Sequence, residues 1–153
     1  MMLKDVYKTI GAPAVLYDFL LERSKLVDVN ISHVKMPSYE EHLEFFNSKP
    51  YRRWYFIFIA TPSLSVFNIK NSQAIGSIYL THNNEIGIFV SEKWREKGYA
   101  KKAIEKLMYF YPEPRYLANI NPNNTKSIEL FSSLGFVHIQ NTYELRNVDK
   151  SGK

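Results

Sequence analysis

The chain has 153 residues, of which 45% are hydrophobic and 15% aromatic, so it can build the core of one ordinary domain. It contains no cysteine, which excludes disulfides, thiolate metal sites and a cysteine nucleophile. Its four histidines lack the spacing of metal ligands, so we expect no metal site. The formal charge of +5 favours an anionic partner, which could be a nucleotide cofactor, a phosphorylated metabolite or nucleic acid.

The first ten residues mix Lys4, Asp5 and Lys8 with apolar side chains, which is unlike the uninterrupted apolar core of a signal peptide. No apolar run approaches the length of a membrane span. We therefore expect a cytoplasmic protein with no membrane partner. Since no repeat or linker divides the sequence, we predict a single domain over residues 1–148 and a disordered tail over 149–153.

Two helices are predicted in the N-terminal third. Residues 14–24 follow Pro13 and are good helix formers. Ser38 and Glu41 have the spacing of a capping box, in which each side chain satisfies an otherwise unpaired backbone donor. This pattern predicts a second helix that begins at Ser38.

Three strands are predicted next. The aromatic and β-branched run at 53–60 predicts the first, and a turn-rich stretch separates it from a second at 74–81. A tight turn at 82–84 then indicates a hairpin into a third strand at 85–91.

The last third alternates helices and strands. Residues 98–111 carry the apolar stripe of an amphipathic helix. We expect a buried strand at 116–121, a short helix at 125–134 closed by Gly135, and one or two strand segments at 136–145. Antiparallel strands come first and a parallel pair around a helix follows, so the predicted class is α+β with a mixed sheet.

The segment 85–108 runs from a strand through a basic loop into the amphipathic helix. Gly98 lets the backbone approach a ligand, Ala100 keeps the opening turn narrow, and Arg95 and Lys97 add positive charge. The free N–H groups of the first helical turn favour an anion such as a diphosphate. A surface loop with solvated charges would give the same pattern, so this segment alone does not decide the function.

A second motif lies at 117–136, where a strand ends in an asparagine-rich turn before a short helix. Asn124 or Thr125 can serve as the N-cap of that helix and Gly135 as its C-cap. An asparagine amide can also bind a ligand amide while it caps a helix, so both interpretations can hold.

Together the two motifs resemble motifs A and B of the GCN5-related N-acetyltransferase (GNAT) superfamily. The matching residues are Arg95-x-x-Gly98-x-Ala100, Asn121-x-x-Asn124-x-x-Ser127 and Leu134-Gly135-Phe136. The resemblance implies a mostly antiparallel central sheet, splayed between the strands at 85–91 and 116–121 and flanked by helices. It also implies acetyl-CoA as co-substrate in the cleft between these strands.

The resemblance assigns cofactor contacts to three groups of residues. The pantetheine arm would pair with the backbone of the first cleft strand, at Ile88, Phe89 and Val90. The diphosphate would lie on Arg95, Glu96, Lys97, Gly98, Tyr99 and Ala100. The other side of the cleft would be bordered by Asn119, Asn121, Asn124, Ser127 and Phe131.

The N-terminal half carries a further resemblance, to acetyltransferases of nucleotide-activated amino sugars and of ribosomal-protein N-termini. The residues that carry it are Ser38-Tyr39-Glu40-Glu41-His42-Leu43 with Phe46 and the aromatic strand after Arg53. It implies an amine acceptor on a small molecule or a peptide. The link between the two helices would overhang the acceptor pocket, which makes His33 a candidate contact, although a capping or solvent-exposed histidine gives the same sequence.

Catalysis requires a neutral amine, whereas an alkylammonium is mostly protonated at neutral pH, so a general base is useful. Glu85 opens the cleft strand and is our candidate base; a strand-end charge beside the turn is the alternative. In the family a tyrosine on the second-motif helix often protonates the leaving thiolate, but Phe131 occupies that position here. Tyr143 is the first candidate for this acid, with Tyr79 or water as alternatives.

The sequence thus predicts an N-acetyltransferase that moves an acetyl group directly from acetyl-CoA to a primary amine. A CoA-binding sensor that lost catalysis is the alternative. A basic nucleic-acid-binding domain is disfavoured, because the cationic residues are dispersed and no recognition motif is present, so we expect no nucleic-acid partner. The chain could also form a homodimer.

Overall fold

The computed structural model describes residues 1–26, 35–60 and 72–145 of the chain. The predicted tail at 149–153 lies outside these residues. The elements follow in the order β1 (Met2–Asp5), the 3₁₀ helix η1 (Val6–Lys8), α1 (Ala12–Ser24), α2 (Tyr39–Asn47), β2 (Arg53–Ala60), β3 (Ser72–Leu80), β4 (Ile86–Val90), the 3₁₀ helix η2 (Glu92–Trp94), α3 (Tyr99–Phe110) and α4 (Thr125–Ser133).

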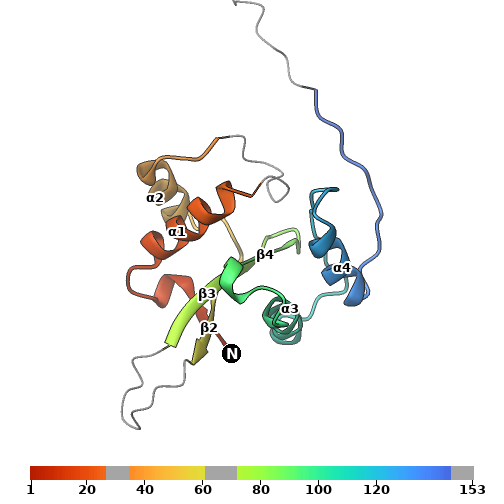
Figure 1. Ribbon diagram of the computed structural model, residues 1–153, viewed down its shortest axis with the longest axis horizontal. Helices are drawn as coiled ribbons and strands as arrows, with labels where there is room; N and C mark the ends of the chain where they lie inside the picture. The colour runs from red at the N-terminus through yellow and green to blue at the C-terminus, as the bar shows by residue number, and fades with distance from the viewer. Residues whose placement is uncertain (27–34, 61–71, 146–153) are drawn as a thin grey trace, which may run out of the picture.

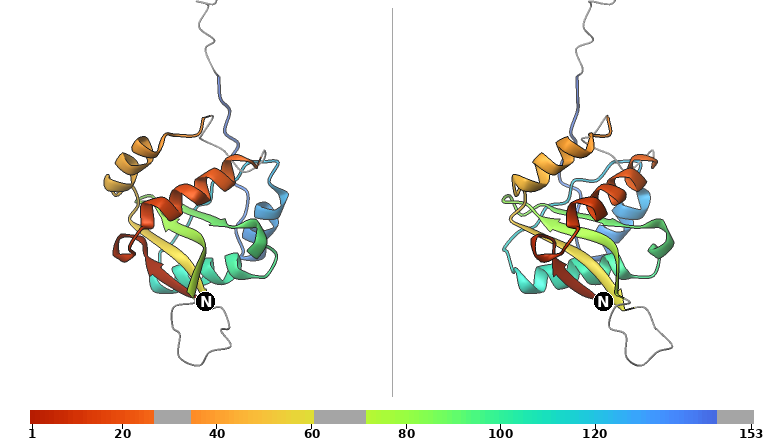
Figure 2. Two further views of the ribbon diagram at one scale, coloured as in Figure 1. Left: turned by 60° about the vertical axis from the view of Figure 1, so that its left-hand side comes forward. Right: turned by 90° about the vertical axis from the view of Figure 1, so that its left-hand side faces the viewer.

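The four strands form one antiparallel sheet in the order β1-β2-β3-β4. Helices α1 and α2 lie on one face of this sheet, and α3 and α4 lie on the other (Figures 1 and 2). The predicted α+β class, with a mostly antiparallel sheet and flanking helices, is confirmed. No helix within the described ranges is long and apolar enough to cross a membrane.

The protein has two hydrophobic cores, one on each face of the sheet. Strand β2 contributes side chains to both, because successive residues of a strand point to opposite faces. Trp54 and Phe56 pack with Val6 and Leu16 on the α1 and α2 face. On the other face a larger core combines the sheet with α3 and α4; its buried members include Ile57, Ile59, Ile75, Ile78, Leu80, Ile104, Leu107 and Phe131.

The predicted capping box starts α2. Ser38 Oγ accepts from the backbone N–H of Glu41 (3.2 Å), and Glu41 Oε2 accepts from the N–H of Ser38 (2.7 Å). These bonds satisfy two donors at the first turn that have no partner inside the helix.

Strand β1 was not predicted. It pairs with β2 in the register Met2↔Phe58 to Asp5↔Tyr55, and the ammonium of Lys4 lies 4.3 Å from the centre of the Phe58 ring. Its four residues become a strand through pairing with a neighbour that is distant in sequence, which local composition does not reveal.

Two segments that were predicted to be strands, 116–121 and 136–145, do not form strands. Residues 116–121 make a single parallel bridge, between Glu85 and Leu117, and then diverge from β4. Residues 136–145 form no strand and lead away from the helices (Figure 1), with Val137, Ile139 and Tyr143 exposed. Their alternating apolar pattern suits a strand, but a strand also needs a neighbouring edge, and the described residues bring none to this segment.

Candidate functional site

The site is built around the edge of β4 that faces away from β3. The N–H of Thr81 donates to the carbonyl of Glu85 (2.9 Å) and the N–H of Ser91 to that of Ile75 (2.8 Å), so the odd-numbered residues of β4 direct their backbone groups toward β3. Ile86 instead donates to the carbonyl of Leu117 (2.8 Å). By the same alternation, the backbone N–H and C=O of Ile88 and Val90 point to this outer edge.

Among the described residues, another stretch of backbone pairs with the outer edge only at its start. Glu85↔Leu117 is the one isolated bridge that the described residues form, and the chain after Leu117 turns toward α4. The parallel pair therefore splays apart beside Ile88 and Val90, as expected. The side chains of Phe89 and Val90 are both buried, on opposite faces of the sheet: the Phe89 ring centre lies 5.6 Å from that of Phe19 in α1, whereas Val90 belongs to the core shared with α3 and α4.

Helix α3 begins next to this edge with an uncapped N-terminus. Gly98 is the N-cap residue, with φ of +77°, and no side chain in the part of the chain that the structure describes caps the first turn. A Cβ on Gly98 would meet no atom of the described residues within 4 Å, so these residues leave the space in front of the turn open. Glu96 also has a positive φ, +60°, which shapes the loop. The unpaired N–H groups and the helix dipole make this turn suitable for an anion.

The predicted loop residues lie around this turn. Arg95 Nε donates to the carbonyl of Val90 (2.8 Å), which brings its guanidinium to the end of the open edge. Lys97 Nζ donates to the carbonyl of Lys93 (3.0 Å) and lies 4.8 Å from the centre of the Trp94 ring. Tyr99 and Ala100 are half-buried and pack against the core, which fastens the start of α3.

The start of α4 forms the opposite side. Asn124 caps the helix, because its Oδ1 accepts from the N–H of Ser127 (3.1 Å), and Asn121 Oδ1 accepts from the N–H of Asn123 (2.9 Å). The capping interpretation is therefore confirmed, while a ligand role for these amides stays a prediction.

An ion pair that the sequence did not predict joins the two sides. Lys126 Nζ lies 2.5 Å from Glu96 Oε1, and both side chains are about 70% exposed, at 72% and 71%. The pair links the loop before α3 to the first turn of α4. Its partners are far apart in sequence, and nothing in their spacing indicates the contact.

Phe131 lies in the core instead of at a ligand surface. It is 4% exposed, and its ring meets that of Phe136 edge-on with centres 5.0 Å apart. This correction follows from the apolar face of α4, which has to be buried against α3 and the sheet. Phe131 offers neither a hydroxyl nor an accessible surface in this structure.

Glu85 is half-buried and hydrogen-bonded from two sides. Thr81 Oγ1 donates to its Oε2 (3.2 Å), and Asn119 Nδ2 donates to its Oε1 (3.1 Å). The sequence placed Asn119 along the cleft but did not indicate that it would hold the candidate base.

A pair of stacked tyrosines lies on the face that Glu85 shares with Gly87 and Phe89. The Tyr79 ring lies over Gly87, where a Cβ would come within 1.9 Å of Tyr79 Cζ. Tyr79 and Tyr51 stack with centres 3.8 Å apart and planes 4° apart. Burial, and then the neighbouring Tyr79, raise the pKa of Tyr51 well above its ordinary value.

Two further predicted residues are not brought to this site. Tyr143 is 89% exposed in the segment 136–145, which is not the strand that its predicted role required. His33 lies outside the described residues.

An antiparallel sheet with a splayed outer edge, next to a helix that starts at a glycine and faces open space, is the arrangement that the resemblance to the GNAT superfamily implies. The sequence matches the acetyltransferase (GNAT) family over residues 30–136. The chain belongs to this family and is an N-acetyltransferase.

Solved structures share the fold. A domain from Methanocaldococcus jannaschii is similar at 20% identity, with 94% of this chain and 92% of that chain covered and a TM-score of 0.74. A spermidine N-acetyltransferase chimera from Vibrio cholerae gives 17% identity, coverage of 92% and 84%, and a TM-score of 0.61. A ribosomal-protein-alanine N-acetyltransferase from Brucella melitensis is similar at 14% identity. The match covers 88% of this chain and 83% of that chain, with a TM-score of 0.61. No curated protein sequence matches the chain.

Proposed function

We propose that this enzyme transfers an acetyl group from acetyl-CoA directly to a primary amine of a small molecule or a peptide. The observation that carries the proposal is the outer edge of β4, where the backbone groups of Ile88 and Val90 face the gap left by the diverging residues after Leu117. An extended amide-bearing chain can add to such an edge as a strand does. The pantetheine arm has this character.

The diphosphate is assigned to residues 95–100. The uncapped first turn of α3 supplies backbone donors, and the open space in front of Gly98 admits a phosphate group. Arg95 and Lys97 contribute positive charge at the same loop. On the other side, Asn119, Asn121, Asn124 and Ser127 would border the arm.

Glu85 is the proposed general base. Its carboxylate lies at the closed end of the gap, held by Thr81 and Asn119, where it can take a proton from the incoming ammonium directly or through water. The thiol of CoA is a tolerable leaving group near neutral pH, so water can supply the final proton. Tyr79, on the neighbouring strand, is the alternative donor, and we give Tyr143 no part because it is exposed on the segment that leads away.

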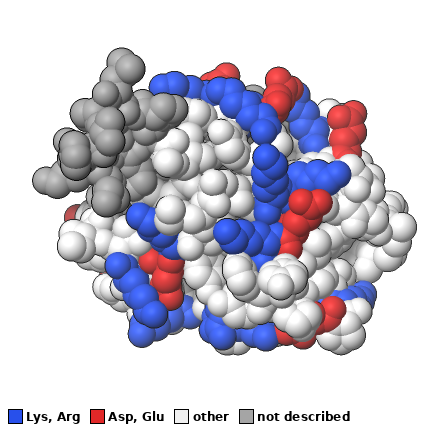
Figure 3. Space-filling model, turned by 90° about the horizontal axis from the view of Figure 1, so that it is seen from below, with Lys and Arg blue, Asp and Glu red and all other residues white. Residues whose placement is uncertain are grey.

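On the face that Figure 3 shows, the charge distribution favours a small anionic cofactor over nucleic acid. On the face shown in Figure 3, Lys and Arg side chains are spread among acidic and uncharged groups and do not gather into one patch. Nucleic-acid binding ordinarily needs a continuous basic surface that follows the phosphates.

The test combines calorimetry with a thiol-release assay. We expect acetyl-CoA to bind the wild-type protein, and CoA to be released with at least one amine from a panel of spermidine, amino acids, a nucleotide-linked amino sugar and a peptide with N-terminal alanine. Absence of acetyl-CoA binding would contradict the cofactor assignment. Binding without turnover of any amine would favour the CoA-binding sensor, to which the missing hydroxyl at Phe131 also points.

A further inference from the structure

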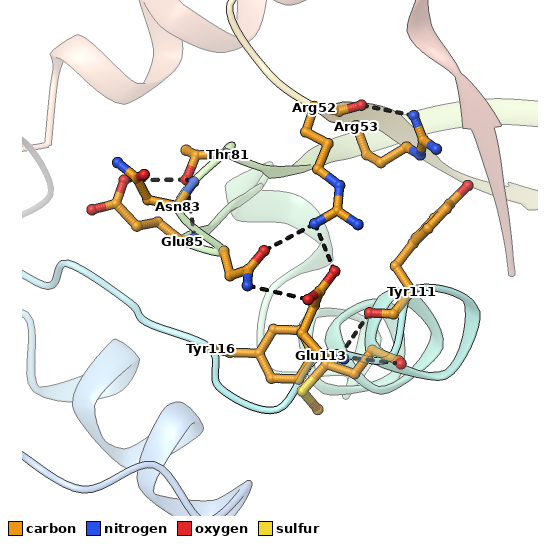
Figure 4. A network of polar contacts seen from close by, with 10 residues as sticks. Arg52, Arg53, Thr81, Asn83, Glu85, Tyr111, Glu113 and Tyr116 are labelled. Atoms are coloured by element: carbon orange, nitrogen blue, oxygen red, sulfur yellow. Dashed lines mark hydrogen bonds and ion pairs between the residues drawn. The ribbon is translucent and has the colours of Figure 1, made fainter.

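A polar network lies beside the proposed base (Figure 4), at the end of β4 that is farther from the cofactor loop. Arg52 Nη1 lies 2.6 Å from Glu113 Oε1 and donates to Asn84 Oδ1 (3.0 Å). Asn84 Nδ2 in turn donates to Glu113 Oε2 (3.3 Å). The three side chains thus form a closed ring of contacts among three separate segments of the chain.

The backbone of Glu113 is also held in place, which fixes the position from which its carboxylate projects. The N–H of Glu113 donates to the hydroxyl of Tyr116 (2.8 Å), which donates to the carbonyl of Tyr111 (2.7 Å). These bonds fold the connection after α3 into a tight turn. Glu113 is 18% exposed and Arg52 33%, so the pair is partly shielded from water.

Asn84 passes this restraint to Glu85, its neighbour in sequence. Asn84 has a positive φ of +61°, its N–H donates to the carbonyl of Thr81 (3.2 Å), and its own carbonyl accepts from the N–H of Leu117 (3.0 Å). Asn84 is therefore linked covalently to Glu85, which carries the proposed base, and by a hydrogen bond to Leu117, where the other side of the cleft begins.

We propose that Arg52, Asn84 and Glu113 are positioning residues for Glu85, an inference that rests on the proposed function. The network fixes the turn from which Glu85 projects, while Thr81 and Asn119 fix the carboxylate itself. A partly exposed ion pair contributes little to stability. Misplacement of a catalytic group by about 1 Å, in contrast, can lower a rate about a hundredfold.

Four kinds of variant distinguish a role in positioning Glu85 from a role in stability alone. Glu113→Gln keeps the shape of the side chain and removes its charge. Asn84→Gly removes the amide, yet glycine adopts a positive φ freely, so the turn itself is preserved. Arg52→Gln and the conservative Arg52→Lys form a pair for rescue. Glu105→Gln, on the exposed side of α3, is the matched control for loss of one carboxylate.

Four quantities are measured for each variant: kcat with the best amine of the panel, the Kd of acetyl-CoA, the pH profile of kcat/KM, and hydrogen exchange at the N–H groups of Leu117 and Ile86. For Glu113→Gln and Asn84→Gly we expect kcat to fall about tenfold to a hundredfold. The Kd of acetyl-CoA should stay within about twofold, because the cofactor loop lies at the other end of β4. Exchange at Leu117 should quicken, and Arg52→Lys should recover part of the activity that Arg52→Gln loses.

The shape of the pH profile should be retained at a lower plateau, since the base is still present but less well placed. Wild-type kcat in both Glu113→Gln and Asn84→Gly would overturn the inference, and so would equal losses of kcat and acetyl-CoA affinity. A wild-type protein that turned over no amine would refute the proposed function first, and that failure would be visible before any variant is made.

Discussion

The side-chain amide of Asn119 donates a 3.1 Å hydrogen bond to the carboxylate of Glu85, and thereby joins the two sides of the cleft at the point where they separate. Asn119 was predicted to border the pantetheine arm; it also orients the candidate base. The closed end of the gap is therefore held by side-chain contacts as well as by the Glu85↔Leu117 bridge. Both contacts hold the carboxylate at the closed end of the gap, where the proposed function requires a general base.

Replacement of Glu85 by glutamine should lower kcat by about two to four orders of magnitude, because an amide cannot accept the proton of the ammonium. The activity that remains should rise with pH, because without a base only the unprotonated amine can react. Acetyl-CoA affinity should not change, since this position lies outside the diphosphate loop. Steady-state kinetics and calorimetry check both statements, with the exposed Glu44→Gln as control. Full activity of the Glu85 variant would remove this residue from the mechanism.

Local patterns predicted the elements whose ends carry their own signals. The capping box located the start of α2, the aromatic and β-branched run gave β2 at 53–60, and the apolar stripe gave α3 within one residue at each end. For these segments the decisive interactions lie within a few residues of one another, so the sequence displays them directly.

Contacts between distant segments could not be predicted. Strand β1 exists because Met2–Asp5 meets β2, and the pattern at 136–145 gives no strand because no edge among the described residues meets it. The site divides in the same way: the glycine-capped start of α3 is local, whereas Arg52 and Glu113 become neighbours only in the folded chain. Phe131 was assigned to the cofactor by its place in a motif, but burial of the α4 face decided its role.

Gly98→Glu should abolish measurable acetyl-CoA binding, because it places a carboxylate in front of the turn proposed to hold the diphosphate. The chain offers a matched control in Gly11, which is also the N-cap residue of a helix, has φ of +74° and faces open space. Gly11→Glu should impose the same backbone strain, about 1 kcal/mol, without affecting the cofactor. Calorimetry and urea unfolding of the two variants compare affinity and stability. Equal affinities would show that the diphosphate does not lie at Gly98.

Two glycines of the β3–β4 hairpin should differ in their tolerance of alanine. A Cβ at Gly76 would lie 2.1 Å from the carbonyl oxygen of Phe89, which is backbone and cannot yield without disrupting the sheet. At Gly87 the obstacle is the far end of the Tyr79 side chain, which can rotate away. We expect Gly76→Ala to lower the free energy of unfolding by about 2 kcal/mol or more, and Gly87→Ala by less than half as much. Urea unfolding of the two variants measures both changes, and equal losses would contradict this difference.

The same Gly87→Ala change should be visible at Tyr51. Displacement of the Tyr79 ring removes one of the causes that raise the pKa of Tyr51, so the alkaline titration of this phenol should move down toward its ordinary range. Ultraviolet absorbance of phenolate as a function of pH reports the change. An unaltered titration, together with unaltered stability, would mean that Tyr79 keeps its place beside Tyr51 despite the added methyl group.

The Glu96–Lys126 contact predicts a pH effect with a definite sign. The hydrogen bond from Lys126, and then its charge, hold the pKa of Glu96 below the ordinary value. A carboxyl whose pKa is lowered by folding contributes stability that is present above the unfolded-state pKa and is lost as the pH falls through the folded-state pKa. Carbon-13 NMR should show a low midpoint for Glu96 in the wild type and an ordinary one in Lys126→Met. Because both groups are exposed, 1 M salt should shrink the difference, whereas a midpoint that stayed low in Lys126→Met would assign the effect to the loop backbone and not to the ion pair.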